Sequence, residues 1–105
     1  MSQINVLFRV KVKADREDEF YKLAIEMARS TIAEDEGCIT FTYHQHAKDP
    51  GDFFLYEQWR DREALQAHLD RLTEVYGPPE EGNFLPASLT DFWDDVQAEM
   101  FNVVE

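Results

Sequence analysis

The sequence contains a single cysteine, Cys38, among its 105 residues. One cysteine excludes an internal disulfide and a metal site built from several thiolates, as is typical of a reducing compartment. No apolar run approaches the roughly 18 residues that mark a membrane-spanning helix. The first residues, Met-Ser-Gln-Ile-Asn, show no basic segment followed by a long apolar run. We therefore expect no signal peptide, no membrane partner and a cytoplasmic location.

Basic residues are also scarce. Ten Lys and Arg stand against 22 Asp and Glu, which gives a formal net charge of −12. Such a charge repels phosphate backbones, so we expect no nucleic acid partner. The four glycines form no G-x-G-x-x-G motif, so nothing indicates a dinucleotide or flavin cofactor. Hydrophobic residues nevertheless make up 44% of the chain, including eight Phe. This composition predicts one folded domain over residues 1–105 with a modest core.

Alternating hydrophobic residues predict three strands. Apolar side chains occupy every second position from Ile4 to Val12, which is the pattern of a half-buried strand. Residues 38–46 are expected to form a second strand with Ile39, Phe41 and Tyr43 on one face, and residues 53–59 a third. The intervening Lys-Asp-Pro-Gly-Asp favours a turn, so these two strands should form an antiparallel hairpin.

Two helices are predicted between and after these strands. Asp15 is expected to cap the first helix, which should end near Glu34. Asp61 is expected to cap the second. Helical spacing gives this second helix an inward stripe made of Leu65, His68, Leu69 and Leu72.

The last third of the chain is less regular. Gly77–Leu85 cannot continue a helix because it contains Gly-Pro-Pro and no apolar period. Ser88 with Asp91 resembles a capping box and predicts a short third helix that carries Leu89, Phe92, Trp93 and Val96. Residues 100–104 are expected to form the last strand.

The predicted order is β-α-β-β-α-(α)-β, a ferredoxin-like α+β fold with an antiparallel sheet and helices on one face. The third strand is apolar on both faces, with Phe53, Leu55 and Trp59 on one and Phe54 and Tyr56 on the other. A sheet covered on one side only should show water a polar face. We therefore expect a second copy to cover it, giving a homodimer with a dimeric α/β barrel. The segment 77–88 is the alternative cover.

Four short motifs resemble antibiotic biosynthesis monooxygenase domains. Asp-Glu-Gly-Cys-Ile-Thr-Phe at 35–41 is similar to the family's E-x-G-C-x-x-Y/F. Asp-Pro at 49–50 and Tyr-Glu-Gln-Trp at 56–59 are similar to its D-P turn and Y-E-x-W, and Ala-Leu-Gln-Ala-His at 64–68 to its A-L-x-x-H. The resemblance covers residues 4–72 in detail.

The resemblance implies a dimeric barrel and a pocket between sheet and helices. It also implies oxidation by O2, without a cofactor, of a small aromatic, quinol or polyketide-like compound. Two departures fall beside the expected pocket mouth. Leu72-Thr73-Glu74 replaces a second His that the family often carries, and the segment 77–88 is longer than the usual connection.

His68 is the strongest candidate for a catalytic residue. It lies on the apolar stripe of its helix and so points toward the sheet. One interpretation is a core histidine bonded to a backbone carbonyl or to Glu57. The other is a general base facing the pocket, which would take a proton from a hydroquinone-like substrate.

Four further residues are candidate substrate contacts. Trp59 could stack on an aromatic substrate or be plain core. Tyr56 could line the pocket or a dimer interface. Asn5 could bond a substrate carbonyl or lie at a solvated strand end. Phe92 is expected first in the core and second as a pocket lid.

The spacing of His44 and His46 could chelate a metal, but the sequence places no third ligand, so we expect a surface pair and no metal site.

Three functions fit these features. The first is a cofactor-independent monooxygenase with His68 as base. The second is an isomerase or lyase that transfers a proton with the same histidine and no oxygen. The third is a ligand-binding or stress-associated barrel without catalysis. Anaerobic assay separates the first two, and a His68→Ala variant that still binds its ligand would favour the third.

Overall fold

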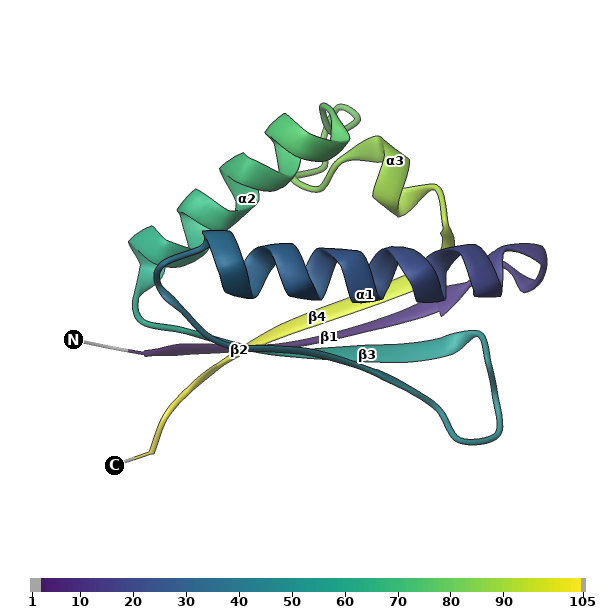
Figure 1. The fold of residues 1–105 in the computed structure, drawn as a ribbon, viewed down its shortest axis with the longest axis horizontal. Coiled ribbons are helices and arrows are strands. Elements are labelled where there is room, and N and C mark those ends of the chain that lie inside the picture. The colour runs from purple at the N-terminus through teal and green to yellow at the C-terminus, as the bar shows by residue number, and fades with distance from the viewer. Residues whose placement is uncertain (1–2, 105) are drawn as a thin grey trace.

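The computed structural model describes residues 3–104 and confirms the α+β fold expected from the sequence. The elements follow in this order: β1 (Ile4–Val12), a 3₁₀ turn (Ala14–Arg16), α1 (Glu17–Glu34), β2 (Cys38–Gln45), β3 (Asp52–Trp59), α2 (Arg62–Tyr76), α3 (Ala87–Thr90) and β4 (Trp93–Asn102). The strands form one sheet in the order β2-β3-β1-β4, and all neighbouring pairs are antiparallel. Figure 1 shows α1 and α2 on the same side of this sheet.

Alternation along β1 decides which side chains meet the helices. Ile4, Val6, Phe8 and Val10 are buried, whereas Leu7 and Arg9 between them are exposed. Residues paired across neighbouring strands lie on the same face, so the β1–β3 register places Leu55, Glu57 and Trp59 on the helix side. Leu7, Phe54 and Tyr56 therefore lie on the other, open face.

The start of α1 differs from the prediction. Asp15 does not cap the helix but lies in the 3₁₀ turn, and Arg16 at the N-cap makes no side-chain capping bond. Three acidic residues in the first turn, Glu17, Asp18 and Glu19, place negative charge at the positive helix end, which stabilises it without a cap. The prediction for α2 is confirmed, because the Asp61 carboxylate accepts the backbone N–H of Ala64 at 2.9 Å.

The predicted end of the chain is corrected in two ways. The third helix covers only 87–90, and its N-cap is Pro86. The Ser88 hydroxyl does not cap α3 but donates to the Tyr76 carbonyl at the C-terminal end of α2, at 2.7 Å. The last strand begins at Trp93 and not at residue 100, because the backbone of β4 pairs with β1 along its length. The helical spacing of apolar residues in this segment was misleading, since an edge strand need not alternate.

The start of β2 also departs from strict alternation. The register with β3 shifts between Cys38 and Thr40, which leaves Ile39 54% exposed. Ile39 therefore does not share the buried face of Phe41, as the sequence pattern had suggested.

No helix within the described residues 3–104 is both long enough and apolar enough to cross a membrane.

Candidate functional site

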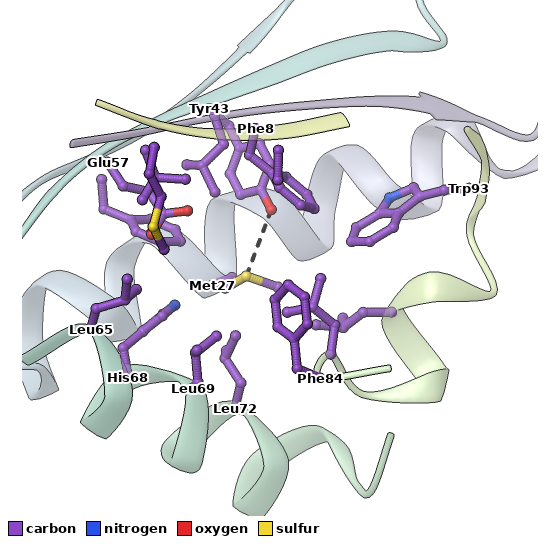
Figure 2. Close-up of a pocket in the computed structure, with 17 residues that line it drawn as sticks. Phe8, Met27, Tyr43, Glu57, Leu65, His68, Leu69, Leu72, Phe84 and Trp93 are labelled. Atoms are coloured by element: carbon purple, nitrogen blue, oxygen red, sulfur yellow. Dashed lines mark hydrogen bonds between the residues drawn. The ribbon is translucent and has the colours of Figure 1, made fainter. Parts of the chain in front are cut away.

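A cavity of about 360 Å³ lies between the sheet, α2 and the segment that leads to α3 (Figure 2). Its walls are formed mainly by apolar side chains from all four strands, from both long helices and from residues 84–89. The polar groups at its surface come from Tyr43, Glu57 and His68. The full lining comprises Val6, Phe8, Met27, Phe41, Tyr43, Leu55, Glu57, Leu65, His68, Leu69, Leu72, Phe84, Leu85, Leu89, Trp93, Ala98 and Met100.

His68 points from α2 into this cavity, as its helical spacing predicted (Figure 2). Its residue exposure is only 2%. Its partner is neither a backbone carbonyl nor Glu57, because Nδ1 lies 2.6 Å from the Asp35 carboxylate. An ionised carboxylate only accepts hydrogen bonds, so neutral His68 carries its proton on Nδ1. Nε2 is then left as a free acceptor for the cavity.

Asp35 is itself held by an arginine. Arg71, one helical turn beyond His68 on α2, donates Nε to one carboxylate oxygen at 2.6 Å and Nη2 to the other at 3.2 Å. Burial opposes ionisation of Asp35, but the hydrogen bonds from Arg71 and His68 outweigh it and hold the carboxyl pKa below its usual value. Burial lowers the pKa of His68, although Asp35 acts in the opposite direction. The imidazole is therefore both uncharged and fixed in orientation near neutral pH.

Gly37 explains how residues 33 positions apart reach each other. A Cβ atom at Gly37 would overlap the Cβ of Ala64, so only glycine lets the first turn of α2 approach the start of β2 this closely. That approach brings Asp35, just before Gly37, next to His68, one turn beyond Ala64. The glycine of the E-x-G-C motif and the alanine of the A-L-x-x-H motif are thus two sides of one contact.

Glu57 is the second ionisable group of the cavity. It lies on the helix side of β3, and its residue exposure is 7%. One carboxyl oxygen accepts the indole N–H of Trp59 at 2.7 Å, and none of the described residues gives Glu57 a basic partner. Burial raises its pKa to about 7, although the Trp59 bond acts in the opposite direction. A large share of Glu57 therefore carries its proton at neutral pH.

Tyr43 adds a hydroxyl to the same cavity. Its O–H donates to the sulfur of Met27 at 3.8 Å, a weak acceptor (Figure 2). Burial raises the pKa of the phenol, so it remains protonated. A bound ligand could replace the sulfur as a better hydrogen-bond partner.

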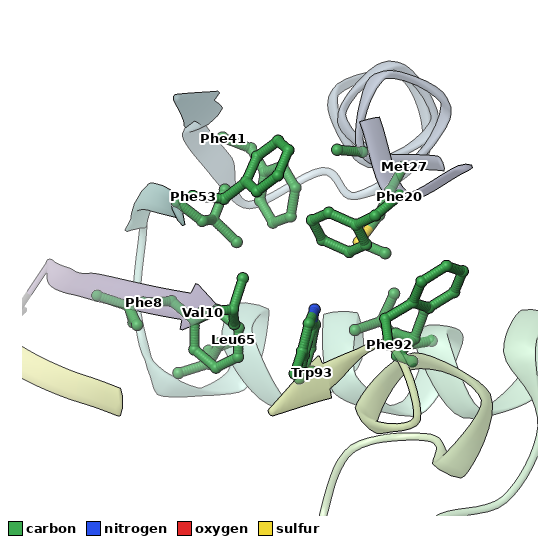
Figure 3. Packing of buried hydrophobic residues seen from close by; sticks show 14 of the residues in the cluster. Phe8, Val10, Phe20, Met27, Phe41, Phe53, Leu65, Phe92 and Trp93 are labelled. Atoms are coloured by element: carbon green, nitrogen blue, oxygen red, sulfur yellow. The ribbon is translucent and has the colours of Figure 1, made fainter. Parts of the chain in front are cut away.

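Three of the expected substrate contacts lie elsewhere. Asn5 and Tyr56 are on the open face of the sheet, because each alternates with residues that face the helices. Phe92 packs against Phe20 in a tilted arrangement with ring centroids 5.5 Å apart, and the Arg16 guanidinium lies 3.8 Å from its ring centroid. Phe92 is therefore part of the packed core in Figure 3 and does not line the cavity.

Trp59 has the orientation expected of a helix-facing residue but is fully buried, with 0% exposure. Its indole lies behind the cavity surface, against His68, with ring centroids 4.6 Å apart. Trp59 therefore supports the polar side chains and does not form the wall itself.

Several functional candidates were not identified from the sequence. Phe84, from the segment 77–88, is one of them and lines the cavity. Trp93, which the sequence suggested for the core first and for a pocket lid second, lines the cavity too. Alternation along β3 could have identified Glu57, since it lies between Leu55 and Trp59 on the buried face of that strand. Asp35 and Arg71 had no periodic signal, because only the fold brings them to His68.

His44 on β2 and His46, which follows the strand, have other contacts. His44 stacks on Phe54 with ring centroids 4.4 Å apart. His46 Nδ1 accepts the backbone N–H groups of Lys48 and Asp49 and so orders the hairpin turn.

Comparison with known proteins agrees with the motifs. The profile of the antibiotic biosynthesis monooxygenase family matches residues 3–73. An uncharacterised protein of Synechocystis sp. is 35% identical over 69 residues, which are 63% of this chain and 44% of that protein. The chain thus spans less than half the length of this curated relative.

Solved structures share the fold over nearly the whole chain. A protein from Nitrosomonas europaea, provisionally described as an antibiotic biosynthesis monooxygenase, has a TM-score of 0.79 at 18% identity, covering 97% of this chain and 90% of its own. A conserved protein from Methanosarcina mazei has a TM-score of 0.75 at 23% identity, covering 96% and 92%. With the profile match over residues 3–73, the chain belongs to the antibiotic biosynthesis monooxygenase family.

Proposed function

We propose that the protein is a cofactor-independent monooxygenase that oxidises a small aromatic, quinol-like compound with O2 in the cavity beside His68. The observation that carries the proposal is the anchored imidazole. Asp35 holds Nδ1 at 2.6 Å, which leaves the basic nitrogen Nε2 for a ligand in a mainly apolar cavity. Family membership supports an oxygenase, and the phenolate formed by such a base can pass an electron to O2.

The lining favours an uncharged ligand. No Lys or Arg is among the residues that line the cavity, and Arg71 nearby is engaged by Asp35. A carboxylate or phosphate would therefore lose its hydration without gaining a cation. A flat aromatic ring, in contrast, would contact Phe41, Trp93 and the leucines of α2.

The test uses naphthalene-1,4-diol and isotopically labelled O2. The expected reaction gives 2-hydroxy-1,4-naphthoquinone and water, with one labelled oxygen in each product. Uncatalysed autoxidation instead gives unlabelled naphthoquinone and hydrogen peroxide, so mass spectrometry separates the two. His68→Gln should lower kcat/KM by about 100-fold or more. His46→Asn, outside the cavity, is the matched control. Equal label incorporation by the His68 variant would refute the proposed base.

We further propose that a second copy covers the open face of the sheet. Leu7 and Phe54 on this face are 36% and 37% exposed, and Phe101 on β4, which pairs with Asn5, is 48% exposed. Tyr56 lies among them. Large apolar side chains exposed on one face of a sheet favour association. Light scattering after size exclusion should give about twice the chain mass of 12.3 kDa. A monomer at micromolar concentration would contradict the dimer.

A further inference from the structure

We propose that Glu57 and His68 form an acid–base pair that interconverts the keto and enol forms of uncharged aromatic ketones without oxygen. Glu57 would be the general acid and His68 the general base. This activity shares its cavity and its histidine with the proposed oxygenase, but it needs no O2 and assigns chemistry to a second residue.

The two groups are held together by one indole. Trp59 donates its N–H to the Glu57 carboxyl at 2.7 Å, and its ring packs on the His68 imidazole with centroids 4.6 Å apart. Trp59 is fully buried, so this spacer does not move freely. Figure 2 shows Glu57 entering the cavity from the sheet and His68 entering from α2. A ligand between the two walls would meet an acid on one side and a base on the other.

Their protonation states suit this task near neutral pH. Glu57 has no cationic partner among the described residues, and burial raises its pKa to about 7. Burial lowers the pKa of His68 below its ordinary value. Between the lowered pKa of His68 and the raised pKa of Glu57, the carboxyl therefore holds its proton while the imidazole is free to accept one.

The proposed step is balanced in protons and charge. His68 Nε2 takes a proton from the carbon next to the ketone, so a C–H bond breaks and an N–H bond forms. The electron pair becomes the C=C bond of the enol, and the carbonyl oxygen takes the proton of Glu57. An imidazolium and a carboxylate result, and the total charge is unchanged. Asp35 stabilises the first and the Trp59 N–H the second, and the reverse step restores both groups.

Other titratable groups near the pair stay in one state. On β2, burial raises the pKa of Cys38 to about 11 and also raises that of Tyr43, so both remain protonated. Behind His68 on the far side from the cavity, Asp35 remains ionised. β1, β4 and α1 present no titratable side chains to the cavity; their contributions include Val6, Met100 and Met27. The pH dependence of the reaction should therefore report Glu57 and His68.

The experiment follows deuterium exchange in D2O under nitrogen. The probes are 1-indanone, 2-tetralone and deoxybenzoin, neutral ketones with an acidic C–H, and proton NMR measures the exchange rate. We expect the protein to accelerate exchange above the buffer rate for at least one ketone. Glu57→Gln should lower this acceleration by about 100-fold or more. Glu63→Gln, an exposed glutamate on α2, should leave it unchanged. No catalysed exchange with any probe, or full activity in Glu57→Gln, would overturn the proposal.

A second variant separates an acid from a structural residue. The Trp59 hydrogen bond lowers the pKa of Glu57, so Trp59→Phe should move the alkaline fall of the exchange rate to higher pH. An unshifted profile would overturn the role of Glu57, and this readout remains even if Glu57→Gln fails to fold. Exchange without label incorporation from O2 would refute only the oxygenase, whereas incorporation without exchange would refute only this inference.

Discussion

The helix-covered face of the sheet is packed at one end and hollow at the other. At the packed end, Phe20 has 0% exposure and meets the rings of Tyr43, Phe53, Phe92 and Trp93 at centroid distances of 5.1 to 6.0 Å. Figure 3 shows the rings of Phe20, Phe53, Phe92 and Trp93 close together between α1, the sheet and the start of β4. At the hollow end the same strands surround a cavity of about 360 Å³, and the Glu57 carboxyl and the His68 imidazole lie at its surface.

The packed end stabilises the fold, whereas the hollow end carries the groups suited to chemistry. Interlocking aromatic rings contribute burial and edge-on contacts, which hold α1 against the sheet. A buried carboxyl without a cationic partner destabilises the fold instead, because its ionised form is poorly solvated. Glu57 therefore destabilises the fold when it is charged, and such a group is typical of a site and not of a core. Each end can be disturbed separately.

Removing the central ring should have the largest effect on folding. Phe20→Ala deletes a fully buried side chain and should lower the free energy of unfolding by about 3–5 kcal/mol. Urea titration followed by circular dichroism measures this change. Tyr21→Ala, next to it on α1 and 47% exposed, is the control and should change stability far less. If the two variants were equally stable, the packed end would not be the anchor of the fold.

The next effect concerns pH and Glu57. The folded state raises the pKa of this carboxyl from 4.5 to about 7, so the folded protein binds the proton more tightly. Protonated Glu57 contributes fully to the free energy of unfolding below about pH 4.5, and this contribution is lost as pH rises through about 7. Between about pH 5 and about pH 8, the wild type should lose about 2 kcal/mol relative to Glu57→Gln.

His68 makes stability depend on pH in the opposite direction. Comparing the free energy of unfolding of the wild type with that of Glu57→Gln at each pH cancels this effect, because both proteins contain His68. Because its pKa is lowered, the stabilising contribution of neutral His68 is complete above its ordinary value of 6.5 and is lost as pH falls below that value. Urea titrations over the pH range give the difference. A constant difference would mean that Glu57 has a normal pKa and that the hollow end is well solvated.

The sequence predicted the packed end better than the hollow one. Alternation predicted the observed bounds of β1, and helical spacing predicted that His68 faces inward. Both predictions depend only on local periodicity. β4 was largely missed because it is an edge strand, where all residues after Trp93 are exposed and no alternation marks the pairing.

The partners of His68 depend on the fold. Asp35 reaches the imidazole across 33 residues through the contact between Gly37 and Ala64, for which neither segment has a periodic signal. Both faces of β3 are apolar, so alternation could not tell which face meets the helices. Tyr56 was therefore expected near the substrate, although Glu57 is the residue that faces the cavity. The structure resolves this by showing which face the helices cover.

A smaller effect is expected from the anchor of His68. In Asp35→Asn the amide can donate to Nδ1, which would move the imidazole proton to Nε2 and remove the base from the cavity. We expect a loss of about 10–100-fold in exchange and oxygenation rates. Nitrogen NMR of the imidazole should report the altered tautomer. Asp70→Asn, an exposed residue on α2, is the control. An unchanged rate with an unchanged tautomer would show that packing against Trp59 alone orients His68.

The smallest effect should arise at the cavity mouth. Phe84 lines the cavity although 63% of it is exposed, so it contributes little to the core. Phe84→Ala should change unfolding by less than about 1 kcal/mol and weaken binding of an aromatic ligand by about 3- to 10-fold, the loss of one aromatic contact. The proton-transfer rate of the bound complex should not change, since the variant leaves Glu57 and His68 in place. Val75→Ala, exposed on α2 and outside the lining, controls for a general surface effect. A rise in KM with constant kcat would assign the segment 77–88 to ligand selection, whereas a fall in kcat would mean that it also positions the ligand between the acid and the base.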